Sequence, residues 1–173
     1  MDRKQEGFFI LIALRLSGLA SFAGLIAYVL KPANLGFSAM PVPNWLRWIG
    51  VGLGCLAALL LFWTLHSLGK NLTDTVVTRR QHTLVTTGPY RWVRHPFYLC
   101  AALIIVAITF ISANALFLVT GGFVLLFLRI RTPIEERHLL NRFGDDYRNY
   151  MSRTGRFFPC FRGPASLAKD NRL

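Results

Sequence analysis

The sequence predicts an all-α integral membrane protein with about four transmembrane helices and a cytoplasmic amphipathic helix near its C-terminus. Composition is the first reason. Hydrophobic residues make up 53% of the 173 residues and charged residues only 16%, against about 25% charged in ordinary soluble domains. The second reason is that the apolar residues gather in runs suited to membrane helices, which need roughly 20 residues to cross a bilayer. Most of the chain therefore requires a solvent other than water.

Four apolar segments are expected as spans. The first two, at about 8–30 and 45–68, are each longer than the roughly 20 residues that an upright helix needs. The third and fourth, at about 97–111 and 115–130, are shorter, and only three residues separate them. These two are therefore expected to form a tight helical hairpin.

Basic residues predict the orientation of the spans. The chain has 20 Lys and Arg against 8 Asp and Glu, which gives a net charge of +12. Lys31 and Arg47 flank the first loop, and Arg15 lies inside the first span. All other basic residues fall on one side if the N-terminus is cytoplasmic, as the positive-inside tendency requires. Four spans then place both termini in the cytoplasm. The charge indicates contact with anionic lipid rather than with nucleic acid.

A further helix is expected over residues 132–153, beyond the fourth span. Leu140, Phe143, Tyr147 and Tyr150 repeat at spacings of three and four, which places them on one helix face. The pattern predicts an amphipathic helix that lies on the membrane or covers a site at its surface.

The start of that helix fits a capping box, with Thr132 at the N-cap, Pro133 at the first helical position and Glu135 three residues after the cap. A cap alone would explain Glu135. However, Arg131 and Glu135 are four residues apart at the apolar boundary, and charged side chains at that depth usually line a polar cavity. Both interpretations of Glu135 are open at this point.

The segment TTGPYRWVRHPFY, residues 86–98, is the densest cluster of special residues in the chain. Residues 88–90, Gly-Pro-Tyr, are typical of a turn. Pro96 is expected to begin the third span, because proline is favoured at the first helical position. The positive end of that helix, beside Arg94 and His95, suits a carboxylate or a phosphate. The alternative is that these basic residues anchor the helix in lipid headgroups.

The predicted hairpin returns the chain to the side from which it started, so residues 94–98 and 131–136 are expected to be neighbours. The aromatic residues of the first segment then offer faces that attract sulfonium or ammonium groups, although an interfacial aromatic belt is an equal alternative. No metal site is expected, because the three cysteines are far apart and no Cys/His spacing typical of zinc occurs.

Two stretches, HTLVTTGPYRWVRHPFY (82–98) and RTPIEERHLLNRFGDDYRNYMSRTGRFFP (131–159), resemble the isoprenylcysteine carboxyl methyltransferase family, whose superfamily includes phospholipid N-methyltransferases. The resemblance covers roughly 66–159 as a catalytic core. Residues 1–65 match only as generic membrane spans of the same single membrane domain, and 160–173 are expected to form a flexible tail. The resemblance implies an S-adenosylmethionine-dependent methyltransferase that acts on a hydrophobic or membrane-embedded acceptor at the cytoplasmic face. The short chain with few extra elements is typical of a prokaryotic member, so a location in a prokaryotic inner membrane is expected.

The resemblance also implies roles for individual residues. The cofactor-binding residues would be His82, Thr83, Leu84, Val85, Tyr90, His95, Pro96, Phe97, Tyr98 and Glu135. The catalytic residues would be Arg131, Glu135 and Glu136, with Arg131 also binding the substrate. A carboxylate acceptor needs no general base, whereas an amine or thiol must lose a proton. Glu136 and His138 are the candidates for that base.

Two other functions compete with this one. Membrane sterol reductases share a similar Gly-Pro-Tyr and Arg-His-Pro region and use NADPH, but they typically carry Asn before the following Tyr. Here Phe97 precedes Tyr98, which favours the methyltransferase. A non-catalytic lipid-binding protein would be expected to have lost the polar cluster, which is intact. The sequence leaves open the methyl acceptor and the oligomeric state.

Overall fold

The structure is a computed structural model that describes residues 3–69 and 84–159, with side chains from residue 8 onward. Within those ranges the chain is helical, and its extended pairing is limited to two isolated β-bridges. The chain divides into two compact units, which are described one at a time. Unit 1 comprises Met1–Leu60 and Tyr98–His138, and unit 2 comprises Leu61–Phe97 and Leu139–Leu173.

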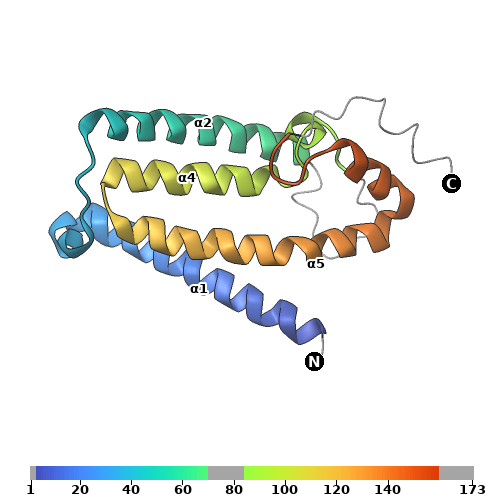
Figure 1. Ribbon diagram of the computed structural model, residues 1–173, viewed down its shortest axis with the longest axis horizontal. Helices are drawn as coiled ribbons and strands as arrows, with labels where there is room; N and C mark the ends of the chain where they lie inside the picture. The colour runs from blue at the N-terminus through green and yellow to red at the C-terminus, as the bar shows by residue number, and fades with distance from the viewer. Residues whose placement is uncertain (1–2, 70–83, 160–173) are drawn as a thin grey trace. The chain divides into compact units, whose positions relative to one another are not determined.

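Four α-helices account for most of the described chain (Figure 1). Three of them contain segments long and apolar enough to cross a membrane, and the fourth, α4, is a shorter apolar helix of 17 residues. The all-α membrane class and the four apolar segments are therefore confirmed. The helices are α1 (Arg3–Leu30), α2 (Asn44–Leu68), α4 (Pro96–Ser112) and α5 (Ala115–Arg153), with short 3₁₀ helices η1 (Pro32–Ser38) and η3 (Gly88–Arg91).

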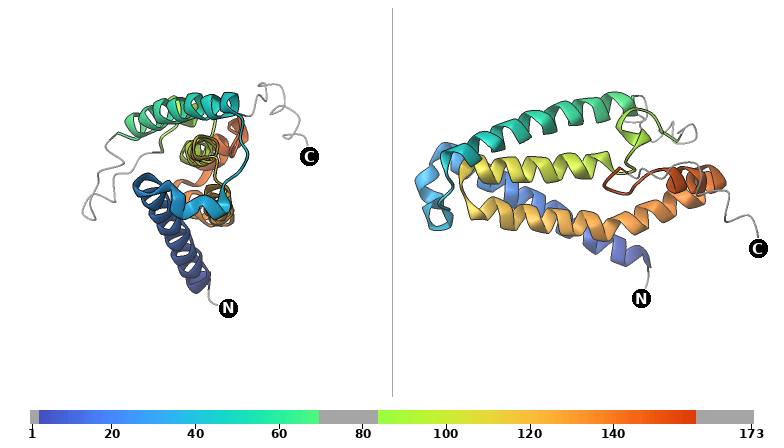
Figure 2. Two further views of the ribbon diagram at one scale, coloured as in Figure 1. Left: turned by 90° about the vertical axis from the view of Figure 1, so that its left-hand side faces the viewer. Right: turned by 45° about the horizontal axis from the view of Figure 1, so that its top comes forward.

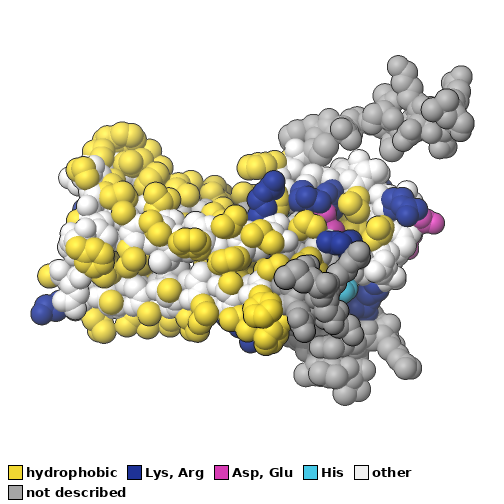
Figure 3. All heavy atoms as spheres, turned by 60° about the horizontal axis from the view of Figure 1, so that its bottom comes forward, with side chains coloured by type: hydrophobic (Ala, Val, Ile, Leu, Met, Phe, Trp, Pro, Cys, Tyr) yellow, Lys and Arg dark blue, Asp and Glu magenta, His cyan; other side chains and the backbone are white. Residues whose placement is uncertain are grey.

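Large apolar side chains remain exposed along the helices, as a lipid solvent requires. Phe22, Leu59 and Phe62 are between 61% and 71% exposed. Figure 3 shows hydrophobic side chains over much of one face of the molecule. Exposed apolar surface on this scale is rare in soluble monomers. These faces are therefore suited to contact with acyl chains.

In unit 1 the predicted hairpin is present, because α4 ends at Ser112 and α5 begins at Ala115. Asn114 fixes the turn. Its side-chain oxygen accepts a hydrogen bond from the backbone N–H of Leu116 at 3.0 Å, which is an N-cap contact at the start of α5. Its amide nitrogen donates to the carbonyl of Leu35 at 2.9 Å. The buried Asn114 therefore starts α5 and ties the turn to η1.

Glycines allow the helices of unit 1 to approach closely, and α4 and α5 run side by side (Figure 1 and Figure 2). A Cβ at Gly121 would lie 2.4 Å from a methyl carbon of Ile105, and a Cβ at Gly50 would lie 2.9 Å from Cβ of Phe110. Neither position has room for a larger residue unless α5 or α2 moves away from α4. Small residues at helix contacts serve this purpose in membranes.

The helix predicted over 132–153 has the expected faces but not the expected start. Tyr147 and Tyr150 are buried, as predicted for the apolar face. However, α5 runs without a break through Pro133, and the hydroxyl of Thr132 donates to the carbonyl of Leu128 at 2.9 Å. The predicted capping box is therefore wrong, because a residue inside a helix does not cap it. The departure from helical geometry comes later, at Gly144, where φ is 53° and ψ is −124°.

In unit 2 the expected turn at residues 88–90 is confirmed. Gly88 has a φ of +60°, a conformation that side chains disfavour. A Cβ there would also lie 2.0 Å from the hydroxyl oxygen of Ser67 in α2. Pro89 and Tyr90 then form η3. Trp92 follows, and its ring meets that of Trp63 edge-on at 5.6 Å.

Candidate functional site

In unit 1, a hydrogen bond between the side chains of Tyr98 and Glu135 joins α4 to α5. Tyr98 lies in the first turn of α4, and its hydroxyl donates to Oε2 of the Glu135 carboxylate on α5 at 2.7 Å. Both side chains are half-buried. The prediction that the hairpin brings residues near the start of the third span beside Glu135 is confirmed for Tyr98.

The carboxylate of Glu135 belongs to a short charged stretch of α5. Arg131 is half-buried and precedes Glu135 by one helical turn, so the two residues share a helix face. Glu136 is 5% exposed, whereas His138 is exposed. Glu135 and Glu136 are the only acidic residues between positions 75 and 144. Carboxylates are costly at an apolar boundary, so the presence of two there favours a binding or catalytic role.

Glu135 and Arg131 together offer hydrogen-bond acceptors and donors that a ligand could use. An ionised carboxylate has two oxygens that accept hydrogen bonds, and Tyr98 occupies one acceptor position of Oε2. Glu135 therefore retains acceptor capacity for hydroxyl or ammonium groups of a ligand. Arg131 offers a planar set of donors that matches a carboxylate. Because the capping box is wrong, an N-cap no longer accounts for Glu135.

In unit 2, the stretch around the Arg-His-Pro motif pairs with the chain that follows α5. The backbone N–H of Arg94 donates to the carbonyl of Gly155 at 2.9 Å, and that of His95 donates to the carbonyl of Arg156 at 3.2 Å. In return, the N–H of Gly155 donates to the carbonyl of Trp92 at 3.2 Å. The two segments run parallel through a bridge at Gly155.

Side chains reinforce this pairing. Nη1 of Arg94 donates to the carbonyl of Met151 at 3.1 Å and also to the carbonyl of Thr154. These carbonyls lie at the end of α5, where the helix dipole favours a cation. The hydroxyl of Tyr150 donates to the carbonyl of Tyr90 at 2.6 Å. Arg94 was expected to meet an anion or lipid headgroups, but in the structure it holds the C-terminal end of α5.

The remaining predicted cofactor residues have different surroundings. His95 is 6% exposed, and its ring centroid lies 6.0 Å from that of Phe157. Pro96 is buried and begins α4 as predicted, whereas Phe97 is exposed. Leu84, Val85 and Tyr90 are half-buried. His82 and Thr83 lie outside the described residues.

The predicted site residues are thus divided between the two units. Tyr98, Arg131, Glu135 and Glu136 belong to unit 1, and Leu84, Val85, Tyr90 and the stretch 95–97 belong to unit 2. Sequence reasoning did not identify Phe157 as a neighbour of His95. Its position in the matching stretch was the available signal, but pairing between distant segments leaves no periodic pattern. Among the described residues, no group of three or more His, Cys, Asp or Glu is arranged to hold a metal ion.

Comparison with known proteins identifies the family. The family model of the isoprenylcysteine carboxyl methyltransferase (ICMT) family matches residues 48–141, more than half of the chain, including Tyr98, Arg131 and Glu135.

Individual relatives are similar over shorter shares of their own length. Protein-S-isoprenylcysteine O-methyltransferase of Saccharomyces cerevisiae is 34% identical over 110 residues, which cover 60% of this chain and 46% of that protein. The Mus musculus protein of the same name is 27% identical over 148 residues, covering 84% and 52%. Nickel-cobalt-cadmium resistance protein NccN of Alcaligenes xylosoxydans xylosoxydans is 32% identical over 116 residues, covering 65% and 52%. The chain spans about half the length of the curated relatives it matches. On the evidence of the family model, the chain belongs to the isoprenylcysteine carboxyl methyltransferase family.

Proposed function

We propose that this protein is an S-adenosylmethionine-dependent methyltransferase that acts on a lipophilic acceptor at the membrane surface. The hydrogen bond between Tyr98 and Glu135 carries the proposal. It joins two residues of the region that matches the family model, at one end of an apolar helical hairpin. The apolar helices give a lipophilic acceptor a route to that end from the bilayer.

The residues fit the cofactor. S-adenosylmethionine has ribose hydroxyls and an ammonium group, and Glu135 retains acceptor positions for both kinds of donor. The sulfonium suits aromatic faces such as that of Tyr98. The family resemblance extends the proposed cofactor site to His82, Thr83, Leu84, Val85, Tyr90, His95, Pro96 and Phe97.

The chain's own residues would act mainly by position. When bound, the cofactor supplies an electrophilic methyl group for an in-line displacement. Glu135 and Tyr98 would orient the donor, and the apolar surroundings would exclude water, which together favour such a transfer. Arg131 would hold an acceptor carboxylate through paired hydrogen bonds. For an amine or thiol acceptor, Glu136 or His138 would take the proton.

Cofactor binding tests the proposal directly. Purified protein in detergent is titrated calorimetrically with S-adenosylmethionine and, separately, with NADPH. We expect binding of the first, with Glu135→Gln weakening it by about tenfold through loss of a charge-assisted hydrogen bond. Asp145→Asn is the matched control, because Asp145 is exposed and pairs with Arg148 on the surface. Absence of S-adenosylmethionine binding, or tighter binding of NADPH, would refute the proposal.

The acceptor is identified by a second experiment. Protein and cofactor with a labelled methyl group are incubated with a bacterial membrane lipid extract, and the label is followed into the organic phase. Arg131→Ala is expected to abolish transfer to a carboxylate acceptor while leaving cofactor affinity within about twofold. Alkali-labile label would indicate a methyl ester, and alkali-stable label a methylated amine or thiol.

We further propose that the protein resides in a prokaryotic inner membrane with both termini cytoplasmic.

A further inference from the structure

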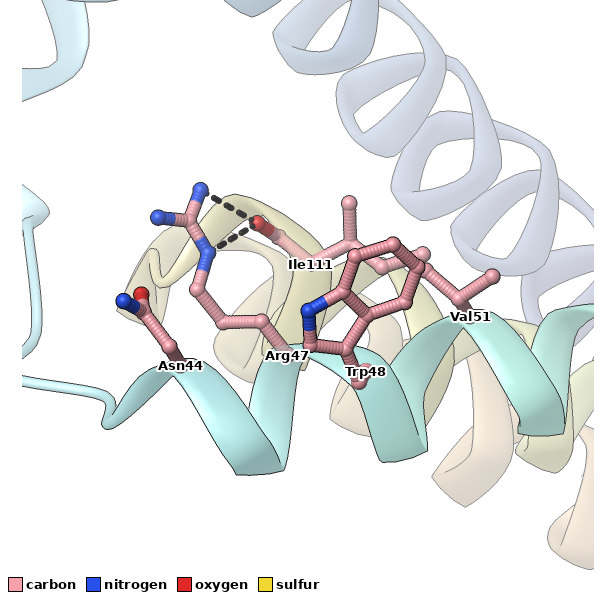
Figure 4. A pocket seen from close by; sticks show the side chains of 5 residues that line it. All are labelled: Asn44, Arg47, Trp48, Val51 and Ile111. Atoms are coloured by element: carbon pink, nitrogen blue, oxygen red, sulfur yellow. Dashed lines mark hydrogen bonds between the residues drawn. The ribbon is translucent and has the colours of Figure 1, made fainter.

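An open cavity of about 330 Å³ lies where α2 begins, within unit 1 (Figure 4). It is far from the proposed methyltransferase site, because Ile111 follows Tyr98 by about 20 Å of helix at a rise of 1.5 Å per residue. The residues that line it are Asn44, Arg47, Trp48, Val51 and Ile111. The proposed function does not use any of them.

Arg47 is the charged group of this cavity. Its Nε and Nη2 donate to the backbone carbonyl of Ile111 at 3.1 and 2.9 Å. That carbonyl belongs to the last turn of α4, where carbonyls have no partner within the helix. A guanidinium carries five N–H donors, so Arg47 keeps further donors for a ligand after these two bonds. The contact holds the guanidinium in place without neutralising its charge.

No acidic residue is close in sequence to balance that charge. Asp and Glu are absent from positions 7 to 73 and from 75 to 134. In the described part of unit 1, the acidic side chains are Glu135 and Glu136, and Glu135 is bonded to Tyr98 at the opposite end of the hairpin. Arg47 is exposed and has no acidic partner among the described residues, so its guanidinium is available to an anion from the surroundings.

The other lining residues fit a ligand that is partly polar and partly apolar. In Figure 4 the amide of Asn44 lies beside the Arg47 guanidinium, and the ring nitrogen of Trp48 is on the Arg47 side of its indole. Trp48 is 74% exposed at the start of an apolar span, where indole rings usually meet the lipid interface. Val51 and Ile111 add apolar surface next to these donors.

We propose that this cavity binds the phosphodiester headgroup of an anionic phospholipid. A phosphate would accept paired hydrogen bonds from Arg47 and further bonds from Asn44 and the Trp48 indole. The first acyl carbons would lie against Val51 and Ile111. The volume is within the range of small-ligand sites, about 300–1,000 Å³, and the open side suits a ligand that arrives from the bilayer. A bound lipid would thus supply an anion for Arg47 and brace α2 against the end of α4.

Native mass spectrometry of the full chain in detergent tests this assignment. Phosphatidylglycerol, phosphatidylcholine and glycerol phosphate are added separately, and dissociation constants are obtained from the bound fractions. We expect phosphatidylglycerol to bind about tenfold more tightly than phosphatidylcholine, with Arg47→Gln removing that preference. Lys31→Gln is the control, because Lys31 is exposed and basic but does not line the cavity; it should leave the preference unchanged.

Arg47→Gln also removes the contact with Ile111, so a second variant separates lipid binding from folding. Trp48→Phe keeps an aromatic ring, though a smaller one, but loses the indole N–H, and should weaken phosphatidylglycerol binding by about threefold with an unchanged thermal midpoint in lipid-free detergent. Equal affinity of the wild type and Arg47→Gln for phosphatidylglycerol would overturn the proposal. Displacement of the lipid by glycerol phosphate at equal concentration would overturn it too, because it would assign the cavity to a free phosphate.

Discussion

Glu135 shows how one hydrogen bond decides between two interpretations of a residue. Its spacing from Thr132 fits a capping box, which would make the carboxylate a helix start signal. Because the hydroxyl of Thr132 bonds back to Leu128 inside a continuous helix, that explanation fails. The carboxylate instead accepts a hydrogen bond from the hydroxyl of Tyr98 on the neighbouring helix. A half-buried acid with a single described partner and spare acceptor positions is suited to a ligand.

Tyr98→Phe tests the value of this bond. Loss of a hydrogen bond to a charged group is expected to lower the free energy of unfolding by about 1.5–3 kcal/mol, and the affinity for S-adenosylmethionine should fall as well. The measurements are the thermal midpoint in detergent and the cofactor titration. Tyr28→Phe is the control, because the Tyr28 hydroxyl donates to an uncharged carbonyl, that of Ser112, at 3.1 Å. If both variants lose stability equally and bind the cofactor as the wild type does, Glu135 has only a structural role.

Among the helices, α5 has an unusual feature, because Pro133 lies inside it and weakens its backbone hydrogen bonding locally. Proline inside a helix removes one backbone hydrogen bond and crowds the preceding turn, yet α5 keeps helical geometry through Pro133 and departs from it at Gly144. Membrane helices tolerate proline when neighbouring groups satisfy the freed carbonyl. The position therefore combines helical geometry with a local weakness, directly before the charged stretch at Glu135.

Pro133→Ala is therefore expected to stabilise the protein. Alanine restores the missing N–H, and the exposed position leaves no cavity, so the free energy of unfolding should rise by about 1–3 kcal/mol. The thermal midpoint in detergent checks this. Pro43→Ala, outside the helix at the start of α2, should produce no such rise. Had Pro133 been the first residue of a separate helix, its replacement by alanine would be neutral or destabilising, and that result would contradict the continuous helix.

The segment after α5, residues 154–156, is held in place by a few hydrogen bonds to residues 92–95. Arg94→Ala removes the bonds to the carbonyls of Met151 and Thr154, so the pairing of Gly155 with Trp92 should open more often. We expect hydrogen exchange at the amide of Gly155 to accelerate by about tenfold or more, which corresponds to about 1.4 kcal/mol of local stability. Arg153→Ala removes a contact within the same helix, to the carbonyl of Asn149, and should leave that exchange rate unchanged. Equal exchange in Arg94→Ala and the wild type would mean that the backbone pairing holds the segment alone.

At the scale of the whole molecule, the features that were predicted correctly are those that depend on residues close together in the sequence. Apolar runs predicted the four helices, Pro96 marked the start of α4, and the short turn before α5 predicted the meeting of Tyr98 and Glu135. The pairing of the Arg-His-Pro stretch with residues 155–156 escaped prediction, because backbone hydrogen bonds between distant segments have no periodic signature. The continuity of α5 through Pro133 was missed because the local preferences of a Thr-Pro pair favour a helix start, whereas the surrounding apolar and amphipathic faces favour a helix that continues past it.

The distribution of basic residues makes a prediction for the whole molecule, namely that both termini are cytoplasmic. Single cysteines are introduced at Ala33 in η1 and at Arg137 in α5, in a background in which Cys55, Cys100 and Cys160 are replaced by alanine. A membrane-impermeant maleimide added to intact cells should label the cysteine at 33, whereas the cysteine at 137 should react only after permeabilisation. Both positions are exposed, so burial does not hide either from the reagent. Labelling of position 137 in intact cells would show that the orientation is the opposite of the predicted one. The proposed methyltransferase residues Tyr98, Arg131 and Glu135 would then face away from a cytoplasmic supply of cofactor.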